Sequence, residues 1–273
     1  NQPATQNKIL FTLASFTYET DKEKALEQMK AAYTPELVYA TADIDLYGSA
    51  LLEAGEVEES TEVYRKLAND YPNPPGVDPT KATLAVQEAQ ATALYGLGKA
   101  LQVQGKVNEA AKYFDDLKKL YPWSPKMLEA NYGIAEAMVG QGQGDDAALL
   151  LAQIIRAQTA TAELRANAML LLGKIQEAKG EYPNAADQYI KIAVFYEAVA
   201  DTAAEGLWRG GQMLEKQAAT LPAAPDPKKP RQPTRPGQLN RALKAYQDLV
   251  SKYPNSQYVK EAKARISALA PAK

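Results

Sequence analysis

The side chains of this sequence that could do acid–base or metal chemistry are mainly carboxylates. Its 273 residues include neither cysteine nor histidine, which removes thiol and imidazole chemistry from them. Adjacent carboxylates occur at Glu58-Glu59, Asp115-Asp116 and Asp145-Asp146. Each pair falls at the start or on the outer face of a predicted helix, where acidic residues offset the helix dipole. We therefore predict no catalytic residue, no metal site and no cofactor.

Binding of phosphate or nucleic acid through charge finds little support. The segment QGQGDD at residues 141–146 places glycines near a predicted helix start, but its two aspartates would repel an anion and no strand precedes it. The chain has 31 basic and 33 acidic residues, for a net charge of -2, and the basic residues are dispersed. No window approaches the roughly 18 apolar residues that cross a bilayer. We predict no nucleic-acid partner and no integral membrane segment.

A two-helix pattern organises the chain, and it is clearest at residues 95–122. The first predicted helix carries leucines on one face around a small residue, Gly98, and Gly105 supplies the turn. The second helix carries apolar residues at three- and four-residue spacing, Ala110, Phe114 and Leu117, and ends before Pro122. Such a hairpin cannot bury its own apolar stripes, so it needs neighbours of the same kind.

The pattern recurs along most of the sequence. The turn position is occupied by Thr20, Gly55, Gly105, Gly142, Gly180 and Gly237. The small residue of the first helix and the aromatic residue of the second helix recur with the turn, for example as Gly48 and Tyr64. In the repeat that contains Gly142, these two positions are occupied by Ala135 and Leu151. These marks define six repeats of about 34 to 38 residues once two insertions are removed.

This pattern resembles the tetratricopeptide repeat (TPR). The resemblance implies an all-α fold, a right-handed TPR superhelix or α-α solenoid of about six helix-turn-helix repeats. We expect one solenoid over residues 1–273, with repeats at 6–35, 41–74, 91–124, 128–161, 166–199 and 202–255, a proline-rich insertion at 221–237 and a capping helix at 256–269. The first helix is expected at 7–18, after a frayed end. Its buried side is expected to carry Ile9, Leu10, Leu13 and Phe16.

The C-terminal part resembles a narrower group. Residues 251–266, SKYPNSQYVKEAKARI, are similar to repeat ends in two bacterial envelope families: the TPR lipoprotein of the β-barrel assembly machinery and the periplasmic coordinator of envelope constriction with division. The resemblance implies an adaptor role in the periplasm or cell envelope. The lack of cysteine fits an oxidising compartment, but many cytoplasmic proteins share it, so a cytoplasmic location stays open.

In a stack of such repeats the first helices line the concave face, which predicts a groove for a partner segment. The outward groove positions are Asp45, Ser49, Tyr95, Lys99, Tyr132, Glu136, Leu170, Lys174, Trp208 and Gln212. Aromatic side chains flanked by mixed charge are typical of binding hot spots, and a peptide or amphipathic helix could lie across them. The alternative is that these aromatics only pack between neighbouring first helices.

The proline-rich insertion is a second candidate surface. Six prolines at two- and three-residue spacing predict an extended polyproline II segment. Its basic residues are Lys228, Lys229, Arg231 and Arg235. The PxxP spacing could dock in an SH3-type groove, and the basic residues could contact an anionic surface. A solvated loop is the alternative.

These observations predict a non-enzymatic scaffold or adaptor that binds a protein or peptide partner in its concave groove, in bacterial envelope assembly. The alternative is the repeat region of a larger protein whose catalytic or membrane-anchoring part lies outside this chain. An enzyme with a carboxylate-only site would need an acidic pair in the groove, but the acidic groove residues Asp45, Glu136, Glu177 and Glu215 lie in different repeats. Self-association through an uncapped first repeat is also left open.

Overall fold

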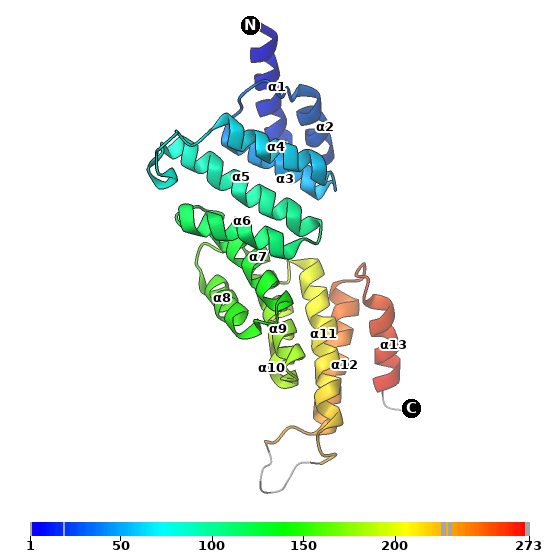
Figure 1. Ribbon diagram of the computed structural model, residues 1–273. Helices are drawn as coiled ribbons and strands as arrows, with labels where there is room; N and C mark the ends of the chain where they lie inside the picture. Colours follow the sequence, from blue (N-terminus) through cyan, green and yellow to red (C-terminus); the bar gives the residue numbers. More distant parts are fainter. Residues whose placement is uncertain (1, 19, 225–227, 229–230, 271–273) are drawn as a thin grey trace. The chain divides into compact units, whose positions relative to one another are not determined.

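Every regular element that the structure describes is a helix. The computed structural model describes residues 2–18, 20–224, 228 and 231–270, and no strand occurs within them. The α-helices are α1 (Gln2–Thr17), α2 (Lys22–Ala32), α3 (Thr41–Glu53), α4 (Val57–Asp70), α5 (Leu84–Val103), α6 (Val107–Leu120), α7 (Met127–Gly140), α8 (Gly144–Arg156), α9 (Ala162–Ala178), α10 (Tyr182–Phe195), α11 (Ala200–Ala219), α12 (Arg235–Lys252) and α13 (Val259–Leu269) (Figure 1). A short 3-10 helix, η1 (Pro79–Lys81), precedes α5. The predicted all-α class is confirmed.

The chain divides into two compact units, Asn1–Ala137 and Met138–Lys273. The first unit contains α1 to α6 and most of α7, and the second contains α8 to α13. Within each unit a helix packs mainly against the helices before and after it in the chain, as α4 does against α3 and α5. Each unit is therefore built from helical hairpins, the arrangement of an α-α solenoid.

Glycine closes four of the hairpins. Gly55, Gly105, Gly142 and Gly180 have φ between +75° and +81°, a left-handed conformation that is strained for residues with a Cβ atom. These positions agree with the predicted turns. Gly237 does not, because α12 already begins at Arg235 and Gly237 lies in its first turn, where its amide donates to the Thr234 hydroxyl at 3.3 Å.

In the first unit, one aromatic ring from α4 and one from α6 each fit against glycines of two first helices. The contacts are Tyr64 with Gly48 and Gly96, and Phe114 with Gly98 and Gly133. A Cβ atom on any of these glycines would lie closer than 3.0 Å to the ring, a distance that real Cβ atoms essentially never show. Both rings are almost fully buried. Glycine therefore sets how closely these helices pack.

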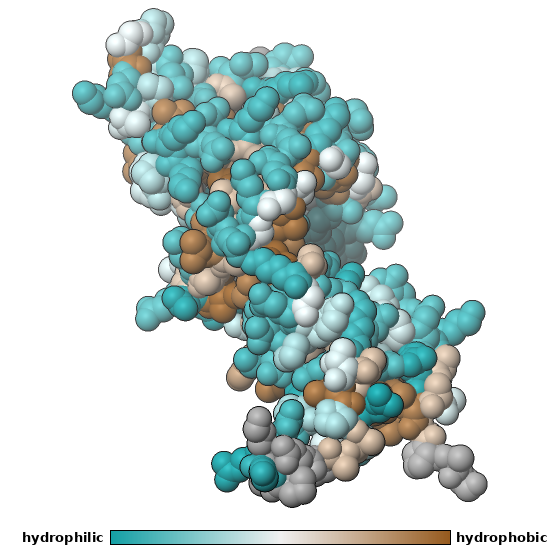
Figure 2. All heavy atoms as spheres, turned by 60° about the horizontal axis from the view of Figure 1, so that its bottom comes forward, coloured by the Kyte–Doolittle hydropathy of each residue, from teal (hydrophilic) through white to brown (hydrophobic). Residues whose placement is uncertain are grey.

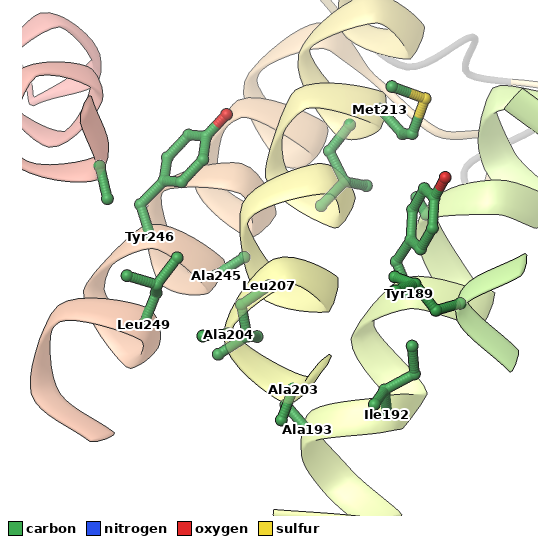
Figure 3. Packing of buried hydrophobic residues seen from close by; sticks show 14 of the residues in the cluster. Tyr189, Ile192, Ala193, Ala203, Ala204, Leu207, Met213, Ala245, Tyr246 and Leu249 are labelled. Atoms are coloured by element: carbon green, nitrogen blue, oxygen red, sulfur yellow. The ribbon is translucent and has the colours of Figure 1, made fainter. Parts of the chain in front are cut away.

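The second unit repeats this packing. Figure 3 shows Tyr189 of α10 and Tyr246 of α12 on opposite sides of α11. The Tyr189 ring lies against Gly173 of α9, and the Tyr246 ring lies against Gly211 of α11. At Gly206 of α11 the backbone of α10 comes close instead, since a Cβ there would lie 2.6 Å from the Tyr189 carbonyl oxygen. Close contacts at glycines thus also set the spacing of α9, α10, α11 and α12.

The first helix differs from the prediction in length and in its buried face. α1 begins at Gln2 rather than at residue 7. Its buried side chains are Phe11 and Ala14, and the Phe11 ring lies 4.6 to 5.9 Å from those of Tyr33, Tyr39 and Tyr47. The side chains predicted to be buried are instead 47 to 74% exposed: Ile9, Leu10, Leu13 and Phe16. α1 carries two apolar stripes, and the one that contains Phe11 meets the tyrosine cluster.

The last helices also differ in part from the prediction. The Thr234 hydroxyl caps α12, so the final three residues of the predicted polyproline segment, 235–237, are helical. In α13, Ala262 is fully buried, and Tyr258, Ile266 and Leu269 are partly buried against the core of the second unit. This is the packing face that the sequence predicts for the capping helix.

The surface mixes polar and apolar side chains. Hydrophilic residues predominate on the face drawn in Figure 2, with hydrophobic residues in patches between them. Among the described helices, none combines the length and the apolar content needed to cross a membrane. Trp123 is one of the large exposed hydrophobic side chains, and 46% of it is accessible.

Candidate partner-binding site

Tyrosines of the second helices hold acidic residues of the first helices in place. The three hydrogen bonds run from Tyr64 to Asp45 at 3.3 Å, from Tyr189 to Glu177 at 3.0 Å and from Tyr246 to Glu215 at 2.7 Å. Burial raises the pKa of all three phenols, and the neighbouring carboxylates add to the shift. Each hydroxyl therefore stays protonated and donates. The rings that set the helix spacing also fix carboxylates on the first helices.

First helices of the first unit line a cavity of about 460 Å³. Eight of its lining residues carry charge, a hydroxyl or an indole: Thr41 and Asp45 from α3, Glu88 and Thr92 from α5, Trp123, Ser124 and Lys126 from the segment that leads into α7, and Glu129 from α7 itself. Side chains from three successive hairpins therefore meet in one concave site.

One ammonium group and three carboxylates line this cavity. Lys126 Nζ lies 2.7 Å from Asp45 Oδ2 and 5.2 Å from the ring centroid of Tyr95. Glu88 is exposed, whereas Glu129 Oε2 is buried and has no hydrogen-bond partner among the described residues. Burial raises the pKa of Tyr95, and Glu129 and Asp45 add to this, so the phenol is neutral. The cavity is therefore acidic overall.

The other predicted groove residues of the first unit lie on the same helices but are largely engaged in packing. Ser49 and Tyr64 share a hydrogen bond of 3.2 Å, and Glu136 accepts one from Gln102. Lys99 and Tyr132 are half-buried. Tyr95 packs on Phe114 with the ring centroids 6.1 Å apart. The sequence prediction missed Trp123 and Lys126, which lie between α6 and α7. A tryptophan directly after the Pro122 helix stop was the available signal.

In the second unit, the predicted Lys174 belongs to a charge network. Lys174 Nζ lies 3.0 Å from Glu205, which also accepts from Arg209 at 2.7 Å. Arg209 reaches Glu177 at 3.4 Å, and Lys216 reaches the same carboxylate at 3.2 Å. Burial opposes ionisation of Glu205, but the hydrogen bonds from Arg209 and Lys174 outweigh it and lower the pKa of this carboxyl. Each charged group of the network therefore has an oppositely charged partner within it.

The predicted aromatic of the second unit packs inside it. The Trp208 ring stacks on Tyr258 at 6.0 Å and meets Tyr246 at 5.4 Å. Leu170 is only 8% exposed and lies in the core, so it does not project outward as expected. Gln212 is half-buried. At Trp208 the contacts agree with the packing alternative, and its role in partner binding stays a prediction.

The basic residues of the proline-rich insertion are placed only in part. Lys229 lies outside the described residues. Lys228 and Arg231 are exposed. Arg235 is the first residue of α12, where its backbone amide donates to the Pro222 carbonyl at 2.9 Å and its Nε donates to the Ala218 carbonyl at 3.4 Å. Arg235 therefore helps to tie the start of α12 to the end of α11.

A second cavity of the first unit was not predicted. It measures about 900 Å³ and lies between α4 and α6, with apolar lining residues that include Tyr47, Val63, Leu97 and Leu101. Among its charged residues, Arg65 pairs with Glu62 at 2.5 Å and Lys66 pairs with Asp70. The prediction missed this outer groove because it assigned Leu97 to the interior of the stack, whereas Leu97 and Leu101 remain partly exposed.

Comparison with protein families identifies the repeats and the larger family. A tetratricopeptide repeat model matches residues 46–74. The model of the YfiO family, described as "Outer membrane lipoprotein", matches residues 87–271, more than half of the chain. The chain belongs to the YfiO family. Both resemblances drawn from the sequence, to TPR proteins and to an envelope lipoprotein family, are confirmed. A comparison with curated proteins gives no match.

Solved structures similar to this YfiO-family chain are TPR proteins. The C-terminal part of a TPR protein from Cytophaga hutchinsonii has a TM-score of 0.51 and 14% identity over 96% of both chains. A TPR protein from Parabacteroides merdae has a TM-score of 0.48 and 16% identity over 98% of this chain and 100% of its own. YrrB, described as a TPR protein with an unusual peptide-binding site, has a TM-score of 0.47 and 17% identity, over 89% and 97%. At such identities the likeness shows the fold alone.

Proposed function

We propose that this YfiO-family chain is a non-enzymatic scaffold that binds a segment of a partner protein on the first helices of its repeats, in bacterial envelope assembly. The observation that carries the proposal is the cavity lined by α3, α5 and the segment leading into α7. It gathers side chains from three hairpins, and the exposed Trp123 stands among charged groups there. Aromatic and charged side chains that meet in a pocket contribute much of the energy of protein interfaces.

The packing of the repeats supports this function. Because the ring–glycine contacts and the tyrosine hydrogen bonds hold the first helices in place, binding orders the partner segment more than the scaffold, which lowers the entropy lost on association. The envelope assignment is supported by the description of the family. The absence of cysteine from the sequence agrees with an oxidising compartment.

Photocrosslinking in bacterial cells that produce the chain tests this function. A benzophenone amino acid replaces Ala42 or Trp123, which line the cavity, or Lys112, which is exposed on α6 and serves as the control. We expect adducts from positions 42 and 123 with the same envelope protein, identified by mass spectrometry, and none of these adducts from position 112. Absence of adducts from both cavity positions, or identical adducts from all three positions, would contradict the proposed function.

A further inference from the structure

We infer that the cavity lined by α3, α5 and the segment leading into α7 receives a cationic side chain, lysine or arginine, from the bound partner segment. The inference rests on the proposed function and names the chemistry that the partner must carry. Three observations support it: the charge balance of the lining, a buried carboxylate oxygen without a donor, and the position of the chain's own lysine.

The charge balance of the lining leaves two carboxylates uncompensated. Lys126 is the basic residue of the cavity, and its ammonium group is 2.7 Å from Asp45. Glu88 on α5 and Glu129 on α7 remain. They come from different helices, so a cation that enters between them would be attracted from two sides. Charge-assisted hydrogen bonds to carboxylates are stronger than neutral ones, which favours a lysine or arginine side chain.

Glu129 supplies the second observation. Its Oε2 atom is buried and accepts no hydrogen bond from any described residue, while its side chain as a whole is half-buried in the cavity lining. A buried carboxylate oxygen without a donor is unfavourable, and most such atoms in proteins have a partner. Because this oxygen is not accessible from the cavity, an ammonium or guanidinium group there would compensate the charge of the Glu129 carboxylate from its accessible side.

Lys126 supplies the third observation, because it shows how this site holds a cation. Its ammonium group is bound by the Asp45 carboxylate and lies 5.2 Å from the centre of the Tyr95 ring. A carboxylate combined with an aromatic face is a favourable environment for lysine and arginine. Glu88, Glu129 and the exposed Trp123 offer the same combination to a second cation in the same cavity.

Other ligand chemistries fit this cavity less well. A metal ion needs several close ligands, and no group of three or more acidic, histidine or cysteine side chains in the described part of the chain is arranged to hold one. An anion would be repelled by the excess of carboxylates. The volume of about 460 Å³ lies in the range of sites that bind small groups. The outer groove is less selective for charge, because acidic and basic side chains line it in nearly equal number: Glu58, Glu59, Glu62 and Glu109 with Arg65, Lys66 and Lys106.

Tryptophan fluorescence of the full chain tests this inference. The sequence has two tryptophans, so the Trp208→Phe variant leaves Trp123 as the reporter in the cavity. The probe is the blocked tripeptide acetyl-Ala-Arg-Ala-amide, titrated at constant ionic strength. We expect a saturable change in Trp123 emission, and no saturable change with the neutral citrulline peptide. Combined Glu88→Gln and Glu129→Gln substitutions should weaken binding at least tenfold.

Two further variants separate this inference from a general effect of charge or folding. Glu58→Gln with Glu59→Gln removes the same charge from α4, outside the cavity, and should leave the affinity within twofold. Lys126→Met frees Asp45 and should tighten binding several-fold, a change that a folding defect would not produce. An equal response to the citrulline peptide, or equal weakening by both double variants, would overturn the inference. If photocrosslinks from position 42 persist while the arginine peptide gives no saturable change, the scaffold function stands and the cation site does not.

Discussion

At the scale of the residue, contacts between rings and glycines decide how closely the helices approach. Phe114 is fully buried between Gly98 of its own hairpin and Gly133 of the next. Replacing a glycine in a helix by alanine gains up to about 1 kcal/mol from helix propensity. Overpacking a rigid site loses about 1 to 3 kcal/mol. Because the ring has backbone on both sides, we expect the overpacking loss to dominate.

The Gly98→Ala variant should therefore lower the free energy of unfolding by about 1 kcal/mol net. Adding Phe114→Leu should make the double variant more stable than the sum of the two single changes predicts, because the smaller side chain makes room for the methyl group. The fourth repeat has this combination of residues in Ala135 and Leu151, which are both fully buried. Urea unfolding of the four proteins measures the coupling.

Gly140 provides the control for this cycle. A Cβ atom at Gly140 would meet nothing within 4 Å, so Gly140→Ala should not destabilise the chain. Additive effects of Gly98→Ala and Phe114→Leu, or equal losses from Gly98→Ala and Gly140→Ala, would show that the ring does not set the helix distance.

Glu205 makes stability depend on pH. Burial opposes its ionisation, but bonds from Arg209 and Lys174 prevail and lower its pKa. The unfolded chain then binds the proton more readily, so Glu205 stabilises the fold above the ordinary glutamate pKa of about 4.3, and this contribution is lost as pH falls through the folded pKa. Glu205→Gln should lower the free energy of unfolding by about 1 kcal/mol at pH 7 and by less at pH 3. Urea unfolding at both pH values measures this.

The exposed Glu261 on α13 is the control for pH. Glu261→Gln should change stability by no more than about 0.5 kcal/mol at either pH, as is usual for surface substitutions. If Glu205→Gln causes the same loss at pH 3 as at pH 7, the stabilisation does not come from the ionised carboxylate.

At the scale of the element, α1 has two apolar stripes, and only the one that contains Phe11 is buried. Phe11 is fully buried in the tyrosine cluster, whereas Phe16 is 74% exposed. We expect Phe11→Ala to lower the free energy of unfolding by about 3 to 5 kcal/mol, and Phe16→Ala to change it by less than about 0.5 kcal/mol. Thermal unfolding of the two variants compares them directly. Equal losses would mean that both stripes of α1 are packed.

The helices and turns also show how much of the fold can be predicted from the sequence. Turn glycines such as Gly105 and the ring at Phe114 were predictable, because a left-handed turn and a close helix approach each require a particular residue type. The face of α1 was not, because apolar spacing alone cannot choose between two stripes. The site at Lys126 was missed for another reason: its partner Asp45 lies far away in sequence, and the repeat pattern does not cover the segment between hairpins. The predicted boundaries of the six repeats stay predictions.

At the scale of the whole molecule, the two units have separate buried clusters. The cluster of the second unit includes Tyr246, Leu207 and Met213, and that of the first unit includes Phe11 and Tyr64. Tyr246→Ala should therefore reduce amide hydrogen-exchange protection mainly within Met138–Lys273, where the lost contacts lie. Mass spectrometry of peptides from both units measures this. An equal loss of protection in Asn1–Ala137 would show that the two units unfold as one.

The ring–glycine contacts also bear on how such a chain can change by duplication and recombination. Phe114 in α6 fits a glycine of its own hairpin and Gly133 in the hairpin that follows. A hairpin copied to a new position would bring its ring but not the downstream glycine, and the ring would meet whatever residue begins the next hairpin. A segment that starts with a second helix and ends with the following first helix keeps the ring and its downstream glycine together. Such an offset segment is the module that we expect to be exchanged without loss, in evolution or in the laboratory.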